Sequence, residues 1–209
     1  MNLVTWNVKG LGRPAKRFLV KDFLNLHITD VCCLQESKLE DIPAWTWKKI
    51  GGPRLDQFLF LPARGSTGGI IIGWNSTVVE GRLANLGDFS LSVDFKSKKD
   101  TFCWRCTTVY GPTGRNLKSA FWGELHGDAS SPWVLCGDFN AIFSEEDKAS
   151  GHTIGMIFDK PTFFCRIWAF SNPPRWVGGL LGRTVRRTLL GSSWIVFSLT
   201  ALGRLASLG

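Results

Sequence analysis

Hydrophobic and polar positions alternate along several short stretches of the chain, and two longer stretches have helical spacing. Alternation or a short apolar run predicts strands over residues 2–8, 30–35, 57–61, 69–74, 91–95, 102–110 and 133–136. One helix is predicted to begin at Arg13-Pro14, with Phe18, Leu19, Phe23 and Leu26 forming its apolar face, and a second over residues 116–125. Residues 62–68 are rich in turn formers and separate two strands. Many strands with few helices predict a mixed α/β domain over residues 1–159.

This pattern stops after about Asp159. Residues 160–209 show neither clean alternation nor a capped helical period. A stretch without a binary pattern that matches a fold does not pack specifically. We therefore expect residues 160–209 to be a non-native tail that packs poorly.

The charge distribution changes how the basic composition is interpreted. The formal net charge is +8, but seven of the 25 Lys and Arg residues, and none of the 17 Asp and Glu residues, lie in residues 160–209. The first 159 residues therefore carry a net charge of only +1. Folded surfaces normally mix both signs, so the basic balance indicates an unusual tail rather than a basic binding face.

Cysteine usage and hydropathy limit the compartment. The 6 cysteines are not arranged in the paired clusters typical of zinc sites, so the sequence favours free, buried or half-buried thiols in a reducing compartment over a zinc site. The first eight residues are too polar for a signal peptide, and no apolar stretch is long enough to span a membrane. The sequence predicts an intracellular protein, nuclear or cytoplasmic, with no membrane partner and no small-molecule cofactor.

Polar residues stand where several predicted strands end. They are Asn7, Glu36, Tyr110, Asp138 and Asn140. Such positions are where α/β scaffolds place reactive groups. A carboxylate such as Glu36 can hold Mg²⁺, and Asp138 can orient or deprotonate a water. Taken singly, each has a simpler interpretation as a turn residue, a surface charge or a packed ring.

Taken in order, these residues resemble a known family. Trp6-Asn7, Gln35-Glu36, Tyr110-Gly111-Pro112 and Gly137-Asp138-Phe139-Asn140 resemble the successive signatures of the endonuclease/exonuclease/phosphatase superfamily. The flanking segments TWNVKGLGRPAKR, STGGIIIGWN, TVYGP and WVLCGDFNAI are similar to the endonuclease domain of plant LINE-type (non-LTR) retrotransposons. The resemblance covers residues 1 to about 151.

The resemblance implies a fold, a chemistry and a partner. The fold is a four-layered sandwich of the DNase I-like type, with two β-sheets face to face and helices outside. The activity is cleavage of DNA phosphodiester bonds with Mg²⁺ or Mn²⁺. By match of position, Glu36 would be the metal ligand with Asn7 beside it. Tyr110 would contact the scissile phosphate, Asp138 would activate the attacking water, and Asn140 would help to bind the phosphate.

The tail departs from the family. The expected Arg/Leu-Asp-Arg strand and Ser-Asp-His triplet are not found in residues 160–209, which contain no Asp and no His, and His152 stands too soon after the fourth motif to replace the missing His. A one-base shift of frame would let residues 193–198 read Leu-Asp-Arg-Phe-Leu, although codon degeneracy allows many readings. The sequence thus predicts a LINE-type endonuclease with an incomplete C-terminal part and impaired catalysis. The alternatives are an active Mg²⁺-dependent endonuclease or phosphatase, and a non-catalytic binding or scaffold remnant.

Overall fold

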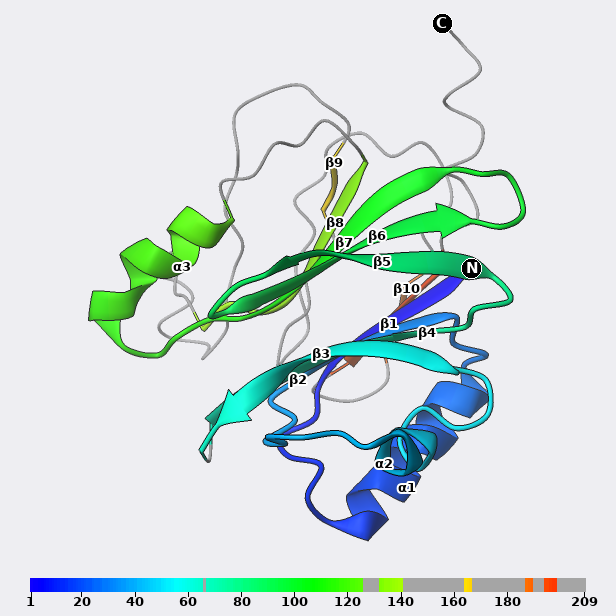
Figure 1. Ribbon diagram of the computed structural model, residues 1–209, viewed down its shortest axis with the longest axis horizontal. Helices are drawn as coiled ribbons and strands as arrows, with labels where there is room; N and C mark the ends of the chain where they lie inside the picture. The colour runs from blue at the N-terminus through cyan, green and yellow to red at the C-terminus, as the bar shows by residue number, and fades with distance from the viewer. Residues whose placement is uncertain (66, 126–131, 141–163, 167–186, 190–193, 199–209) are drawn as a thin grey trace, which may run out of the picture.

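The computed structural model describes residues 1–65, 67–125, 132–140, 164–166, 187–189 and 194–198. Its strands form two sheets that lie face to face (Figure 1). The first sheet has the order β10 (Arg187–Leu189), β11 (Trp194–Ser198), β1 (Asn2–Asn7), β2 (Val31–Gln35), β4 (Thr67–Trp74) and β3 (Gln57–Arg64). The second has the order β5 (Val79–Leu86), β6 (Ser90–Ser97), β7 (Cys103–Tyr110), β8 (Trp133–Asp138) and β9 (Phe164–Arg166).

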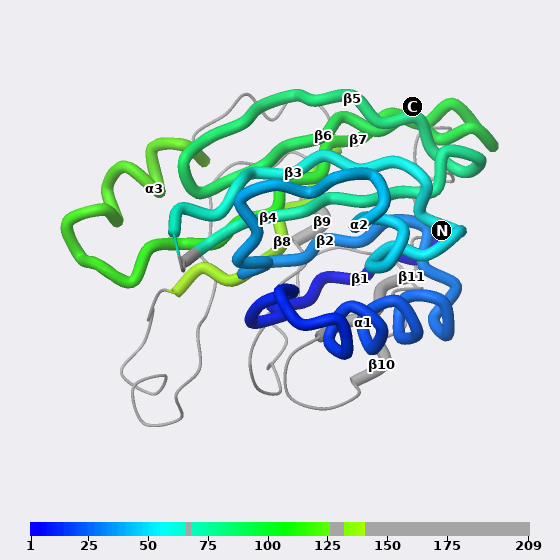
Figure 2. The backbone as a smooth tube through the Cα atoms, turned by 60° about the horizontal axis from the view of Figure 1, so that its bottom comes forward, coloured from blue at the N-terminus to red at the C-terminus, as the bar shows by residue number. Residues whose placement is uncertain are grey.

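Helices flank the two sheets, so the predicted two-sheet α/β sandwich is confirmed. Both α1 (Pro14–Leu26) and α2 (Ala44–Lys48) cover the outer face of the first sheet (Figures 1 and 2). The short η1 (Arg115–Leu117) continues into α3 (Lys118–Glu124) beyond the end of β7. Phe121 and Leu125 of this segment pack with Val109 and Phe139.

Alternation along the strands divides the core into layers. Side chains of one parity, such as Leu3 of β1 and Cys33 of β2, pack between the sheets with Phe95, Trp104 and others. The opposite parity, such as Val4 and Cys32, packs against the helices. Successive strand residues point to opposite faces, which explains why the neighbouring Cys32 and Cys33 lie in different parts of the core.

Parallel pairing sets the position of the chemistry. In the first sheet β1 and β2 are parallel, with Asn7 opposite Gln35, and in the second β7 and β8 are parallel, with Tyr110 opposite Asp138. Parallel neighbours end at the same edge of their sheet. The predicted site residues therefore stand at the carboxyl ends of paired strands.

The predicted apolar face of the first helix is wrong for Phe18, Leu19 and Leu26, whereas Phe23 packs against the core. Val20 and Leu24 are the buried residues of α1, whereas Phe18, Leu19 and Leu26 are 60%, 52% and 77% exposed. The Phe23 ring meets the edge of Trp6 at 5.1 Å, and the Arg17 Nε donates to the Leu11 carbonyl over 2.6 Å. These contacts determine which face of the helix packs on the sheet, so Phe18 and Leu19 remain exposed despite their hydrophobic side chains.

The predicted turn over residues 62–68 is also too long. Strand β3 continues through Pro62 to Arg64, and β4 begins at Thr67. A proline cannot donate to a sheet ladder, but β3 is the edge strand, where an outward-facing position needs no donor. The sequence analysis also missed β5 and α2, whose residues lack strong periodicity.

Three short strands lie within the predicted tail. Strand β11 pairs antiparallel with β1 from Asn2↔Ser198 to Trp6↔Trp194, β10 pairs with β11, and β9 pairs with β8. The rest of residues 160–209 and His152 lie outside the described residues. The domain boundary at 159 and the poor packing of the tail therefore stay predictions.

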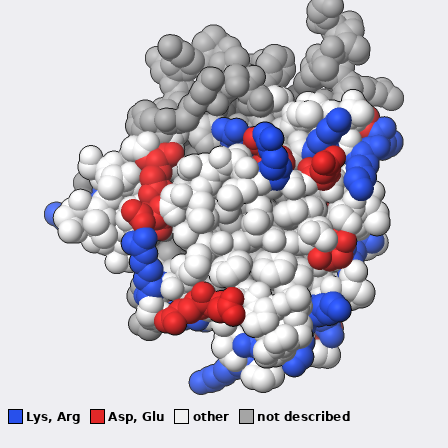
Figure 3. Space-filling view, viewed as in Figure 1, with Lys and Arg blue, Asp and Glu red and all other residues white. Residues whose placement is uncertain are grey.

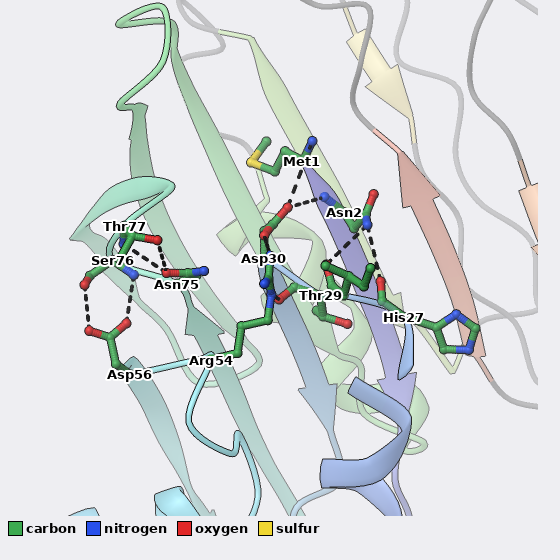
Figure 4. A network of polar contacts seen from close by, with 11 residues as sticks. Met1, Asn2, His27, Thr29, Asp30, Arg54, Asp56, Asn75, Ser76 and Thr77 are labelled. Atoms are coloured by element: carbon green, nitrogen blue, oxygen red, sulfur yellow. Dashed lines mark hydrogen bonds and ion pairs between the residues drawn. The ribbon is translucent and has the colours of Figure 1, made fainter. Parts of the chain in front are cut away.

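The end of the sandwich where β1 begins is held by polar contacts (Figure 4). The Asp30 carboxylate accepts the backbone N–H of Asn2 at 2.8 Å and the Arg54 guanidinium at 2.6 Å. The Arg54 Nε also donates to the Thr29 carbonyl at 3.0 Å. This network, here called the Asp30 network, fixes the start of both β1 and β2.

Candidate active site

The five predicted site residues come from four strand ends in two sheets. Asn7 ends β1 and Glu36 follows β2, whereas Tyr110 ends β7, Asp138 ends β8 and Asn140 follows it. One hydrogen bond joins the two sheets here: the Asn7 Nδ2 donates to the Asp138 Oδ2 over 2.7 Å. The residues of this contact are 131 positions apart in sequence, so the packing of the sheets brings them together.

Both partners of this bond are held in place by local contacts. The Asn7 Oδ1 accepts the backbone N–H of Lys9 at 3.1 Å, which orients the amide so that its Nδ2 points at Asp138. The other Asp138 oxygen accepts the backbone N–H of Asn140 at 3.0 Å. A carbonyl oxygen has two lone pairs, so the Asn7 Oδ1 keeps acceptor capacity for a cation.

Glu36 lies in a loop whose backbone is hydrogen-bonded to the loop after β1 on one side and to β4 on the other. Its carbonyl accepts the N–H of Gly10 at 2.7 Å, and the N–H of Lys38 donates to the Gly68 carbonyl at 3.1 Å. A side chain at Gly69 would place its Cβ 2.3 Å from the Ser37 Oγ, so only glycine allows the β4 backbone to lie this close. The loop is therefore positioned from both sides.

The Glu36 carboxylate has a cation beside it. The Lys38 Nζ lies 3.1 Å from the Glu36 Oε1, and the Glu36 side chain is only 18% exposed. The sequence analysis did not identify Lys38, whose only signal was its place two residues after Glu36. A partly buried carboxylate that already holds one cation is suited to exchange it for another.

Tyr110 links the two carboxylates electrostatically. Partial burial raises the pKa of its phenol, and the negative charges of Glu36 and Asp138 raise it further, while a hydrogen bond with the Asn140 side chain opposes them. Both carboxylates are thus close enough to act on one hydroxyl group. The phenol keeps its proton and can donate a hydrogen bond to an anionic oxygen.

Two glycines allow the close approach of the chains around Asp138. Gly137 has φ +133°, and a Cβ there would lie 2.1 Å from the Val109 carbonyl oxygen. At Gly111 a Cβ would lie 2.2 Å from the Phe139 carbonyl oxygen. Asn140, at φ 46°, donates from its Nδ2 to the Gly111 carbonyl over 2.8 Å. Both positions therefore require glycine, because any side chain would collide with the neighbouring backbone.

Unusual backbone conformations concentrate at this site. In the ranges that the structure describes, six non-glycine residues have positive φ, and four of them are Lys9, Glu36, Lys38 and Asn140. Such conformations are sparsely populated and persist where surrounding contacts impose them, often at functional sites.

Lys118, at the start of α3, belongs to the site although nothing in the sequence marked it. Its amino group donates to the carbonyl of Asn140 and, over 3.4 Å, to that of Phe139. Desolvation lowers the pKa of Lys118, against the opposing effect of the Asp138 charge. The lysine thus ties the loop after β8 to the helix and places a positive charge near Asp138.

The donor set at the site consists of oxygens. Carboxylate oxygens of Glu36 and Asp138 and the amide oxygen of Asn7 lie at this edge, and hard divalent ions such as Mg²⁺ prefer such ligands. The residues therefore fit a hard divalent cation.

The face of the molecule in Figure 3 carries basic and acidic side chains interspersed around an uncharged centre.

Among the described residues no helix is long and apolar enough to cross a bilayer.

No curated protein sequence matches the chain. Solved structures do: a functionally unknown conserved protein from Enterococcus faecalis V583 has a TM-score of 0.51 and 19% identity, covering 68% of this chain and 67% of that chain. An endonuclease/exonuclease/phosphatase family protein from Bacteroides thetaiotaomicron has a TM-score of 0.51 and 16% identity, covering 67% and 63%.

At these identities the likeness shows the fold alone, and the chain spans about two thirds of the length of the solved structures it matches. The sequence profile described as "Endonuclease/Exonuclease/phosphatase family" matches residues 4–185, most of the chain. That range contains all five site residues. The chain therefore belongs to the endonuclease/exonuclease/phosphatase family.

Proposed function

We propose that the chain is the endonuclease domain of a LINE-type retrotransposon, a phosphodiesterase that acts on DNA with Mg²⁺ or Mn²⁺ and whose catalysis is impaired. The observation that carries the proposal is the Asn7–Asp138 hydrogen bond across the two sheets, because it brings together residues from two separate motifs. Family members generally depend on divalent metal ions. The plant LINE origin rests on the similarity of the flanking segments.

The roles follow from the chemistry of each group. Glu36, with the Asn7 amide oxygen beside it, would hold the metal ion, which when bound supplies Lewis-acid stabilisation of charge on the phosphate. Asp138 accepts a proton from, or orients, the attacking water, and Asn7 and the Asn140 N–H fix the carboxylate for this task. The protonated Tyr110 donates a hydrogen bond to a phosphate oxygen, and Asn140 helps to bind the phosphate.

The impairment is inferred from residues 160–209. In the family an Asp-His pair contributes to stabilising the phosphate, and these 50 residues contain neither Asp nor His. A one-base shift of the reading frame explains the missing residues, and the gene should then encode Leu-Asp-Arg-Phe in the alternate frame at codons 193–198. An unshifted gene would contradict this explanation.

A plasmid-relaxation assay tests the activity. We expect little or no Mg²⁺-dependent nicking, because losing one preorganised donor at a phosphate lowers the rate by roughly 10²–10³. Glu36→Gln is the matched control, since it removes the metal-binding charge and keeps the shape. Nicking that requires Mg²⁺ and disappears in Glu36→Gln would contradict the impairment and support the alternative of an active nuclease.

A further inference from the structure

A second group of potential ligands lies beneath the candidate active site, inside the core. The Sγ atoms of Cys33, Cys106 and Cys136 all lie within 4.8 Å of one another. The Cys33 and Cys106 sulfurs are 3.6 Å apart, and the Thr108 hydroxyl lies 3.6 Å from the Cys136 sulfur. All three side chains have 0% exposure. These residues are here called the three-thiol cluster.

We propose that the three-thiol cluster binds one thiophilic divalent cation, of the class of Zn²⁺ and Cd²⁺. Thiolates bind Zn²⁺ at about 2.3 Å, which separates sulfurs around one ion by roughly 3.8 Å, and the larger Cd²⁺ needs a slightly wider spacing. The observed sulfur positions are compatible with that spacing. Soft sulfur ligands select these ions over Mg²⁺ and Mn²⁺, so the cluster and the oxygen site at Glu36 do not compete for the same metal.

Charge balance favours a divalent over a monovalent ion. Each thiol that becomes a ligand releases its proton to solvent, so three thiolates and a divalent cation leave one net negative charge in the core. A monovalent ion would leave two, and uncompensated buried charge is costly. Metal binding releases these protons. Binding should therefore strengthen as the pH rises.

The cluster connects the strands that carry the proposed chemistry. Cys33 lies on β2, Cys106 on β7 and Cys136 on β8, and these strands lead directly to Glu36, Tyr110 and Asp138. The ligands come from both sheets, so a bound ion would join the sheets directly below the site. Because the thiols are fully buried, the ion has to enter while the sheets are apart, during folding.

Refolding the full-length chain with Cd²⁺ tests the proposal. The chain is refolded with a slight excess of Cd²⁺ and a large excess of Mg²⁺, which fills oxygen sites, and is then desalted. We expect one retained Cd²⁺ per chain and thiolate-to-cadmium absorption in the ultraviolet. Cys33→Val should lose both, whereas Cys32→Val should keep both, because Cys32 is equally buried but packs on the helix side of the sheet.

Two further measurements keep the outcome decisive. Cys106→Ser replaces the soft ligand with a hard one of similar size, and it serves if Cys33→Val does not fold. Cadmium NMR of the wild type reports the number of sulfur ligands without any substitution. Retention of Cd²⁺ in both Cys33→Val and Cys106→Ser, a shift typical of oxygen ligands, or a folded wild type that retains no Cd²⁺ would overturn the proposal.

Discussion

The two ends of the sandwich use carboxylates in opposite ways. At the start of β1 and β2, Asp30 is matched by Arg54, by the amino terminus and by the N–H of Asn2. At the other end, the charges of Glu36 and Asp138 both raise the pKa of Tyr110, and the Lys38 side chain, which pairs with Glu36, is 41% exposed. The first end is organised for stability, and the second keeps negative charge near a surface where a cation can bind.

The backbone shows the same difference. Four non-glycine residues with positive φ lie at the active-site end, whereas one, Ile28, lies at the Asp30 network. The Asp30 network combines strand starts and helix-terminal carbonyls, including bonds from the Asn2 Nδ2 to the carbonyls of His27 and Ile28 at 3.3 and 3.2 Å. Strain and a local excess of one charge lower stability and are retained where function requires them.

The largest expected effect comes from filling the space beside Asp138. Gly137→Ala should lower the free energy of unfolding by roughly 3–5 kcal/mol, because strain at its φ adds to the clash with Val109. Gly12→Ala is the control, since its Cβ would meet nothing within 4 Å. Urea denaturation followed by tryptophan fluorescence measures both. Equal stability of the two variants would contradict the close approach of β7 and β8.

Isosteric removal of one charge at each end tests the comparison directly. Asp30→Asn should cost about 2 kcal/mol of unfolding free energy, because bonds to charged partners are lost at a buried position. Asp138→Asn should cost about 1 kcal/mol, since the Asp138 carboxylate accepts hydrogen bonds from two uncharged donors, the Asn7 amide and the Asn140 N–H. The difference between their urea midpoints is the measurement. A larger loss in Asp138→Asn would mean that the active-site end is the structural one.

Metal binding should distinguish the two ends as well. Saturating Mg²⁺ at ten times its dissociation constant should stabilise the wild type by about 1.4 kcal/mol and Glu36→Gln much less. Lys38→Gln should increase the Mg²⁺-dependent stabilisation, because Lys38 competes for the Glu36 carboxylate. Thermal denaturation with and without Mg²⁺ gives these differences. An unchanged response in Glu36→Gln would exclude Glu36 as the ligand.

The smallest effect concerns the titration of Tyr110, the single tyrosine of the chain. Its pKa is raised above 10.0, so ultraviolet titration of the folded protein should have its midpoint above that value. The folded chain holds this proton more tightly than the unfolded chain. The associated stability is therefore complete below pH 10.0 and is lost as the pH rises through the folded-state pKa. Asp138→Asn and Glu36→Gln should each lower the midpoint, and Asp30→Asn should leave it unchanged.

The family and the two-sheet class could be predicted from the sequence alone, and the sequence also proposed five candidate site residues. Singly, each of those polar residues had a simpler interpretation, and it was the resemblance of four short motifs, in order, to the family that selected them. The Gly residues of these motifs were visible too, although the reason for them, the approach of Val109 and Phe139, is tertiary.

Which distant residues meet depends on how the sheets and helices pack. The Asn7–Asp138 bond, the Lys118 contacts and the three-thiol cluster each join segments that no local pattern relates. The same holds for α1, where contacts with Trp6 and Leu11, rather than hydropathy, selected Val20 and Leu24 for burial. Periodicity shows that a helix has an apolar face. The rotation of the helix against the sheet and the packing of the two sheets depend on how side chains from distant segments fit together in the folded chain.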